Sequence, residues 1–162
     1  MLLRDLAPED LPRVLELNNA AVPAVGELTL PALTELAEMA ALGIVATDPD
    51  AGDAVIGFAL GFGPGAAYGS ENYRYFADRL DDFHYLDRIV VDPAYFRRGV
   101  GSALYDEVER RCAAKVLTCE VNLVPRNDDS LAFHAHRGFE QVGTQQTEGG
   151  KKTVSLLRKE LH

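Results

Sequence analysis

Hydrophobic and polar positions alternate along the chain with two different periods, and each change of period predicts a change of element. Short apolar runs bounded by Gly, Pro, Asn or Asp are typical of strands; they cover 1–7, 43–62 as a hairpin, 83–93, 116–123 and 153–161. Apolar positions three or four residues apart predict helices; these cover 8–22, 31–42, 99–114 and 128–139. The pattern predicts an α/β fold, with a mixed, mostly antiparallel central sheet of about six or seven strands flanked by helices.

The helix over 99–114 has the clearest pattern, because its apolar residues recur at every fourth position: Val100, Leu104, Val108 and Cys112. It connects the strand at 83–91 to the strand at 116–123. A helical connection between neighbouring strands is typical of a parallel pair with a right-handed crossover. These two strands are therefore expected to form a central parallel pair.

Composition narrows the class of protein. A length of 162 residues fits one domain with its own core, so a single domain over 1–162 is expected. The chain has 25 acidic residues against 16 Lys and Arg, which argues against nucleic-acid binding. No run approaches the ~20 apolar residues of a membrane span, and no signal-peptide pattern is visible. Cys112 and Cys119 match no zinc spacing, and a cytoplasmic location with both cysteines in the core is expected.

A glycine-rich turn stands out between the strand at 83–93 and the helix that follows. Arg97 and Arg98 directly precede Gly99, and Gly101 follows two positions later. Glycines permit close approach of a ligand, and the first amides of a helix favour phosphate. Two readings stay open: a pyrophosphate site assisted by the arginines, or a tight turn with solvated arginines. The turn is not a dinucleotide fingerprint, since Leu104 takes the third glycine position, and it is not a P-loop, since no Gly-Lys-Ser/Thr follows.

Two stretches, RIVVDPAYFRRGVGSALYDEVERR and NDDSLAFHAHRGFEQVG, resemble the GNAT (Gcn5-related N-acetyltransferase) superfamily over residues 83–143. The family signature Gln/Arg-x-x-Gly-x-Gly/Ala fits Gly99 and Gly101, although Phe96 stands at the Gln/Arg position. The resemblance implies acetyl-CoA as co-substrate, no metal, and a central parallel pair whose strands splay apart. It implies that these residues bind the cofactor: Ile89, Val90, Val91, Arg97, Arg98, Gly99, Val100, Gly101, Ser102, Asn127 and His134.

The same resemblance points to two catalytic candidates. His134 fills the position where the family usually has the Tyr that protonates the leaving thiolate; the alternative is a buried helix residue that donates to a backbone carbonyl. Glu120 lies on the strand where parts of the family carry a general base; the alternative is a solvated or ion-paired acid. Glu120 and Asn127 are two residues further apart than the family pattern, which predicts a bulge or a longer loop between them.

Two functions remain in competition. The first is an acetyl-CoA-dependent N-acyltransferase that acts by direct transfer on the primary amine of a small metabolite or a peptide N-terminus. The second is a non-catalytic acyl-CoA-binding, sensing or protein-interaction domain on the same fold. The family's usual acceptor walls suggest Asn18, Asn19 and Glu27, and Tyr85, Asp87 and Ile89 alternate onto one strand face. No nucleic-acid or membrane partner is expected, and a homodimer stays open.

Overall fold

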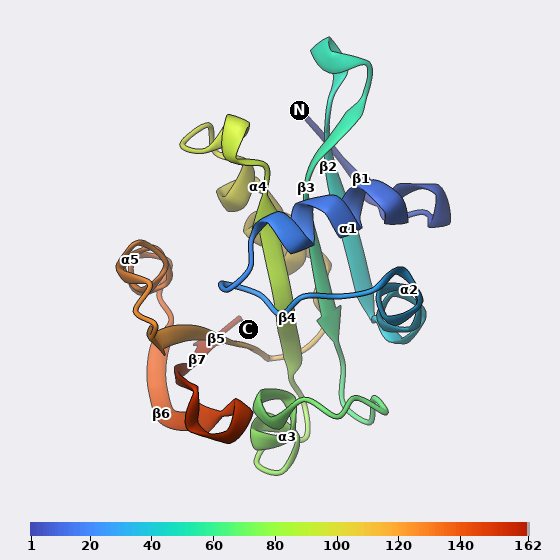
Figure 1. The fold of residues 1–162 in the computed structure, drawn as a ribbon. Helices are drawn as coiled ribbons and strands as arrows, with labels where there is room; N and C mark the ends of the chain where they lie inside the picture. The colour runs from blue at the N-terminus through green and yellow to red at the C-terminus, as the bar shows by residue number, and fades with distance from the viewer. Residues whose placement is uncertain (162) are drawn as a thin grey trace. The chain divides into compact units, whose positions relative to one another are not determined.

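A computed structural model describes residues 1–161 of the chain (Figure 1). Its strands are β1 (Leu2–Asp5), β2 (Leu42–Asp48), β3 (Ala54–Phe62), β4 (His84–Val91), β5 (Val116–Val124), β6 (Glu140–Thr147) and β7 (Lys152–Glu160). Its α-helices are α1 (Leu11–Ala20), α2 (Leu30–Met39), α3 (Glu71–Ala77), α4 (Val100–Arg111) and α5 (Asp128–His136). The strands form a seven-stranded sheet in the order β1-β2-β3-β4-β5-β7-β6. The predicted α/β class and mixed sheet are confirmed.

The described chain divides into two compact units. The first unit comprises Met1–Phe62 and Arg88–Cys112, and the second comprises Gly63–Asp87 and the described chain from Ala113 onward. Antiparallel pairing joins β1 to β2 and β2 to β3 in the first unit, and β5 to β7 and β6 to β7 in the second.

The predicted parallel pair is also present. In the second unit the first residues of β4 lie beside β5, with His84 opposite Leu117 and Tyr85 opposite Thr118. This confirms the parallel direction expected from the helical connection. The separation of the two strands further along stays a prediction.

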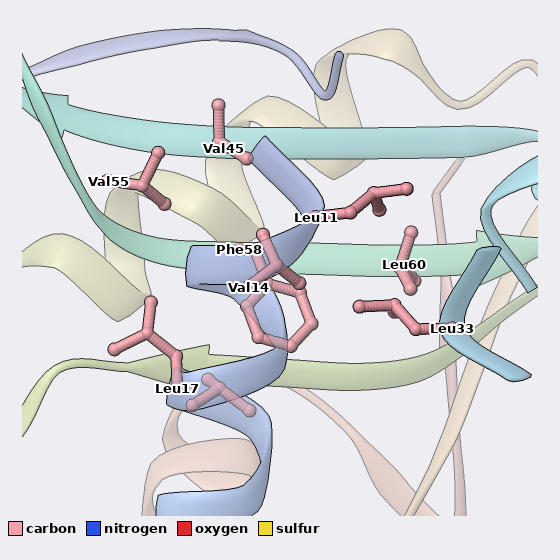
Figure 2. Packing of buried hydrophobic residues seen from close by; sticks show 9 residues of the cluster. Leu11, Val14, Leu17, Leu33, Val45, Val55, Phe58 and Leu60 are labelled. Atoms are coloured by element: carbon pink, nitrogen blue, oxygen red, sulfur yellow. The ribbon is translucent and has the colours of Figure 1, made fainter. Parts of the chain in front are cut away.

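In the first unit α1 crosses one face of the strands and α4 lies on the other (Figure 1). Leu11, Val14 and Leu17 recur every third residue on α1, so they share one face of the helix. They point toward Phe58 and Leu60 of β3 (Figure 2), and all five side chains are buried. Complete burial of one such side chain stabilises a fold by about 1.5–3 kcal/mol. This cluster therefore holds α1 against the sheet.

On the opposite face β3 and α4 approach each other closely at Gly57. A Cβ there would lie 3.0 Å from the carbonyl oxygen of Val90, and 3.2 and 3.3 Å from the side chains of Val100 and Leu104. No side chain fits that space without displacing the backbone of β4. The glycine therefore lets the first turn of α4 pack directly over β3 and fixes where this helix begins.

The second unit has an aromatic core. Tyr73 and Phe76 of α3 pack with Phe83 and with Tyr85 of β4, and each of these four side chains is no more than 3% exposed. The ring centroids of Tyr73 and Tyr85 are 5.7 Å apart in an edge-to-face arrangement, which is a favoured geometry for aromatic pairs. These contacts hold the beginning of β4 in place.

The structure contains two elements that the hydrophobic pattern did not predict. β6 is polar on both faces and mostly exposed, so its sequence has no apolar alternation and only pairing with β7 reveals it. α3 lies inside a stretch rich in Gly and Tyr, and its N-cap Ser70 accepts a hydrogen bond from the Tyr73 amide at 3.3 Å. A Ser followed by an acidic residue is a helix-start signal, and Ser70-Glu71 carries it.

Within residues 1–161, no helix combines the length and the apolar character needed to cross a bilayer.

Candidate active site

The glycine-rich turn contains two residues with left-handed backbone conformations, one on each side of Arg98. Arg97 has φ 61° and Gly99 has φ 80°, and both residues are exposed together with Arg98. The Ala103 amide donates to the Gly99 carbonyl over 3.0 Å. The backbone amides of residues 100–102 come before this first helical hydrogen bond and have no acceptor within the helix. The turn therefore combines helix-start amides with two exposed arginines, Arg97 and Arg98, which is a favourable composition for binding a phosphate.

Contacts on both sides of the segment before the turn hold it in place. Arg13 of α1 donates from Nη2 to Asp92 Oδ2 over 2.8 Å and from Nε to the carbonyl of Val55 over 3.2 Å. The Tyr95 hydroxyl donates to Asp48 Oδ2 over 2.6 Å, and this bond raises the pKa of Tyr95. Because both carboxylates belong to the first unit, the turn is anchored before any ligand arrives.

Burial alternates along the strand end that precedes the turn. Val90 is buried in the hydrophobic cluster, whereas Ile89 and Val91 are half-buried on the other side of the strand. This is the alternation expected for a strand with one face in the core. The main-chain contacts of Ile89 and Val91 with the cofactor stay a prediction.

The predicted cofactor and catalytic residues divide between the two units. Residues 89–91 and 97–102 belong to the first unit. Glu120, Asn127 and His134 belong to the second. Whether the residues of the two sets act on one ligand stays a prediction.

Asn127 has a local structural role. Its Oδ1 accepts a hydrogen bond from the Ser130 backbone amide over 3.2 Å and caps α5. The backbone amide of Asn127 donates to the Asn122 carbonyl over 3.1 Å. Side chains of this type commonly cap helices. The cap explains why an Asn precedes this helix, and a cofactor contact from the same side chain stays a prediction.

His134 is buried on α5 between the rings of Phe133 and Phe139. Its Nδ1 lies 2.7 Å from the Ser130 carbonyl oxygen. A carbonyl only accepts, so Nδ1 carries a proton, and a second proton would reside on Nε2. Burial lowers the pKa of His134, against a smaller raising effect from the bond to Ser130. The ring is therefore predominantly neutral at neutral pH.

Glu120 is half-buried on β5 and has a defined partner. The hydroxyl of Tyr85 donates to Glu120 Oε2 over 2.6 Å. Burial, followed by the nearby charge of Glu120, raises the pKa of Tyr85 far above its ordinary value, so the phenol keeps its proton and acts as a donor. The pairing was not foreseen from the sequence, because it joins residues 35 positions apart.

The predicted irregularity between Glu120 and Asn127 is present. The register of β5 against β7 shifts between Asn122 and Val124, and Leu123 bridges back to Arg126. This bulge takes up extra residues after Glu120.

The expected acceptor residues Asn18 and Asn19 organise the segment between α1 and α2. Asn18 is completely buried and donates to the Gly26 carbonyl, and Asn19 forms two hydrogen bonds with the backbone of Leu28, each 3.0 Å long. Arg88 donates from Nη1 to Asn18 Oδ1 and to the Gly26 carbonyl. Sequence reasoning did not single out Arg88, although an arginine directly after Asp87 in a mostly apolar strand is the signal that could have found it.

Three other expectations concern the acceptor side and the cysteines. Glu27 is exposed in the same segment, and Asp87 accepts a hydrogen bond from the Tyr68 hydroxyl over 2.8 Å. Cys112 and Cys119 are buried thiols, which confirms them as core residues. Among the described residues, no group of three or more His, Cys, Asp or Glu side chains is arranged to hold a metal ion.

Comparison with known structures shows the same fold over nearly the whole chain. Ard1 from Thermoplasma volcanium has a TM-score of 0.79 at 18% identity, covering 99% of this chain and 97% of that one. The ribosomal-protein-S18-alanine N-acetyltransferase from Escherichia coli has a TM-score of 0.72 at 21% identity, covering 99% and 93%. YncA of Salmonella typhimurium, a putative acetyltransferase solved with its cofactor acetyl-CoA, has a TM-score of 0.73 at 18% identity, covering 100% and 94%.

None of the curated proteins matches the sequence. The family model described as the acetyltransferase (GNAT) family matches residues 11–139, a range that includes the anchored turn, Glu120 and His134. The chain belongs to the acetyltransferase (GNAT) family of acetyl-CoA-dependent N-acetyltransferases.

Proposed function

We propose that this protein transfers the acetyl group of acetyl-CoA directly to a primary amine of a small metabolite or of a peptide N-terminus. The amine nitrogen forms a bond to the acetyl carbonyl carbon, and the carbon–sulfur bond of the thioester breaks. One amine proton goes to a base, and CoA leaves as a thiolate that takes up a proton.

The half-buried Glu120 carboxylate, held by the Tyr85 hydroxyl at 2.6 Å, is the observation that carries this proposal. An attacking amine must lose a proton, and a positioned carboxylate accepts one directly or through one water. The same geometry makes the alternative of a loosely solvated surface acid less favourable, because one oxygen is committed to a buried phenol. Glu120 is therefore assigned as the general base.

The turn at residues 97–102 supports the cofactor half of the reaction. Its left-handed residues, its helix-start amides and its two arginines fit the pyrophosphate of acetyl-CoA. Ile89, Val90 and Val91 are assigned to the pantetheine arm through their backbone, and Asn127 supports the same arm. When bound, acetyl-CoA supplies the activated acetyl group, and this chain supplies the anchoring and the proton acceptor.

His134 is assigned as the proton donor to the departing thiolate. Because Nδ1 already donates to the Ser130 carbonyl, the donated proton comes from Nε2 of the doubly protonated ring. The lowered pKa of His134 makes that form scarce at neutral pH, and it also makes the form a stronger acid when it arises.

We propose small amines as the first class of acceptor and peptide N-termini as the second. The Asn18–Asn19 segment is tied down by buried hydrogen bonds, which suits a shaped wall around a compact acceptor. One structural neighbour is a ribosomal-protein-S18-alanine N-acetyltransferase, so a peptide that begins with alanine is the second candidate.

The experiment is acetyl-CoA turnover against amino acids, polyamines, aminoglycosides and alanine-led peptides, with release of free thiol and the mass of the product as readouts. We expect at least one amine to gain an acetyl group. Glu120→Gln should lower that turnover by on the order of 10²-fold while leaving acetyl-CoA affinity unchanged. Tight acetyl-CoA binding with no acetylated product across the panel would favour the non-catalytic acyl-CoA-binding alternative and overturn the proposal.

A further inference from the structure

Tyr85 is a buried titratable group that the reaction does not use directly. Its side chain is completely buried in the second unit, and its hydroxyl hydrogen points at Glu120 Oε2 over 2.6 Å. A buried phenol needs a hydrogen-bond partner, and a hydrogen bond to a carboxylate is stronger than one to a neutral acceptor. The buried Tyr85 hydroxyl therefore makes its hydrogen bond to the carboxylate that is assigned as the base.

Neighbouring aromatic rings hold the ring of Tyr85 in place. It lies 5.7 Å from the ring of Tyr73, edge to face, and 6.1 Å from the ring of Phe76. Its backbone pairs with Thr118 of β5 in the parallel ladder. Glu120 is two residues further along the same strand, so Thr118 and Glu120 project on one side of it. The phenol oxygen is thus a fixed point from which Glu120 is oriented.

The charged and titratable groups around this pair come from several elements. Asp87 lies on the same strand as Tyr85 and accepts from the Tyr68 hydroxyl at 2.8 Å, and Tyr73 belongs to α3. The residue opposite Glu120 on β7 is Leu156, which is apolar and buried. Asp87 is the other acid whose charge raises the pKa of Tyr85, and Tyr85 donates its hydrogen bond to Glu120.

We propose that Tyr85 is a positioning residue that fixes the Glu120 carboxylate through Oε2 and so orients it to accept the amine proton. This inference rests on the proposed role of Glu120 as base. The phenol does not exchange its proton during the reaction. It restricts the rotation of the carboxylate, and it favours the charged form of that carboxylate because it donates a hydrogen bond to it.

The test compares Tyr85→Phe with Tyr73→Phe. Tyr73 is equally buried, but its hydroxyl donates to the Gly63 carbonyl at 2.6 Å and not to Glu120. We expect Tyr85→Phe to lower kcat about 10-fold with little change in the KM for acetyl-CoA. The acid limb of its pH profile should move to higher pH, because the carboxylate loses a bond that favours its charged form. Tyr73→Phe should leave the limb in place.

A second readout is independent of turnover. Side-chain carboxyl carbon signals, assigned by comparison with Glu120→Gln, are followed by NMR across pH in wild type, Tyr85→Phe and Tyr73→Phe. The Glu120 signal should titrate at higher pH in Tyr85→Phe alone. If no amine is acetylated by the wild type, the proposed function fails while this titration still tests the contact between the two residues.

Three results would overturn the inference. One is an unchanged pH profile and an unchanged carboxyl titration in Tyr85→Phe. Another is full turnover in Glu120→Gln, which keeps an acceptor for the phenol and applies even if Tyr85→Phe does not fold. The third is a Tyr85→Phe defect that adds in full to that of Glu120→Gln, since residues that act through each other do not add.

Discussion

The guanidinium of Arg88 on β4 donates to Asn18 Oδ1 at the end of α1 over 2.9 Å, and the Asn18 side chain is completely buried. The same Nη1 reaches the Gly26 carbonyl at 3.2 Å. One side chain of a strand thus fixes both the helix end and the segment that follows it. If that segment forms the acceptor wall, Arg88 helps to fix the shape of that wall.

Replacing Arg88 by Met, which keeps the apolar stem and removes the donors, should lower the free energy of unfolding by about 1.5–3 kcal/mol, because Asn18 loses a charge-assisted partner. The KM for the amine should rise about 10-fold and the affinity for acetyl-CoA should stay the same. Urea unfolding and steady-state kinetics measure both. Arg110→Met, which removes an exposed pair with Glu107, is the control and should cost less than about 1 kcal/mol. A change in acetyl-CoA affinity alone would contradict the expectation.

The sequence predicts the elements that have an apolar face and misses those that depend on a partner. The four-residue repeat over 99–114 predicts α4, and two extra residues after Glu120 predict the bulge in β5. β6 carries no apolar alternation, so it becomes a strand only because β7 offers a pairing edge.

The contacts of the candidate site depend on register, which a single sequence does not determine. Glu120 can be placed on a strand from its neighbours, but its contact with Tyr85 follows from the pairing of Tyr85 with Thr118. In the same way, the place of Asn18 in the chain, between the first two predicted helices, suggests that it contacts the acceptor. Its bond to Arg88 joins residues 70 positions apart and appears only in the folded protein.

Gly101 offers a test of the turn that does not strain the backbone. A Cβ there would meet only Val91 Cγ2 at 3.9 Å, which is ordinary contact, so Gly101→Ala should fold and bind acetyl-CoA nearly as the wild type does, in line with the Gly/Ala of the family signature. Gly101→Leu should lower acetyl-CoA affinity by calorimetry about 10-fold or more, because the longer side chain occupies the approach of the pyrophosphate to the helix-start amides. Gly69→Leu, at another open position, should bind normally. Equal affinities of Gly101→Leu and Gly69→Leu would place the pyrophosphate elsewhere.

Arg97 should contribute a screened electrostatic contact. The side chain is exposed and its backbone is left-handed with φ 61°, so Arg97→Asn removes the charge while keeping a residue that tolerates this conformation. Acetyl-CoA affinity should drop more at low salt than at high salt, because exposed charges are screened within a Debye length of ~10 Å at 0.1 M. Arg126→Ala, an exposed arginine of the other unit, controls for net charge. A loss that is the same at every salt concentration would exclude a direct phosphate contact by Arg97.

His84 should make the stability of the fold depend on pH. Its side chain is 4% exposed, its Nε2 has no hydrogen-bond partner among the described residues, and burial lowers the pKa of His84 from 6.5 to about 4. As pH falls, His84 therefore takes up a proton at a higher pH in the unfolded chain than in the folded one. The contribution of neutral His84 to the free energy of unfolding is complete above pH 6.5 and is lost toward pH 4, with about 2 kcal/mol gone at pH 5.

Urea unfolding of His84→Leu at pH 7 and pH 5 measures that effect. The variant should lose much less stability between the two values than the wild type does. A smaller slope of the same sign remains, because burial also lowers the pKa of His134. His136→Ala, at an exposed position of α5, should behave as the wild type. A slope in His84→Leu equal to that of the wild type would mean that His84 is not the group that titrates.

His134→Phe distinguishes a catalytic imidazole from a structural one. Phe keeps the ring that packs against Phe133 and Phe139, and it removes the proton and the bond to the Ser130 carbonyl. If Nε2 protonates the leaving thiolate, acetyl-CoA affinity is retained and turnover falls by on the order of 10²-fold. Wild-type turnover should also decline as pH rises through the lowered pKa of His134, because the doubly protonated ring disappears, and this decline should be absent in the variant.

The measurement is kcat at saturating acetyl-CoA across the acid and neutral range, with His136→Phe as the control on the same helix. A thiol has an ordinary pKa of ~8.5, so CoA can leave as a thiolate without a donor. A His134→Phe profile that matches the wild type in height and shape would therefore assign His134 to the packing of α5. In that case its Nδ1 hydrogen serves only to bind the Ser130 carbonyl, and transfer needs no proton donor at position 134.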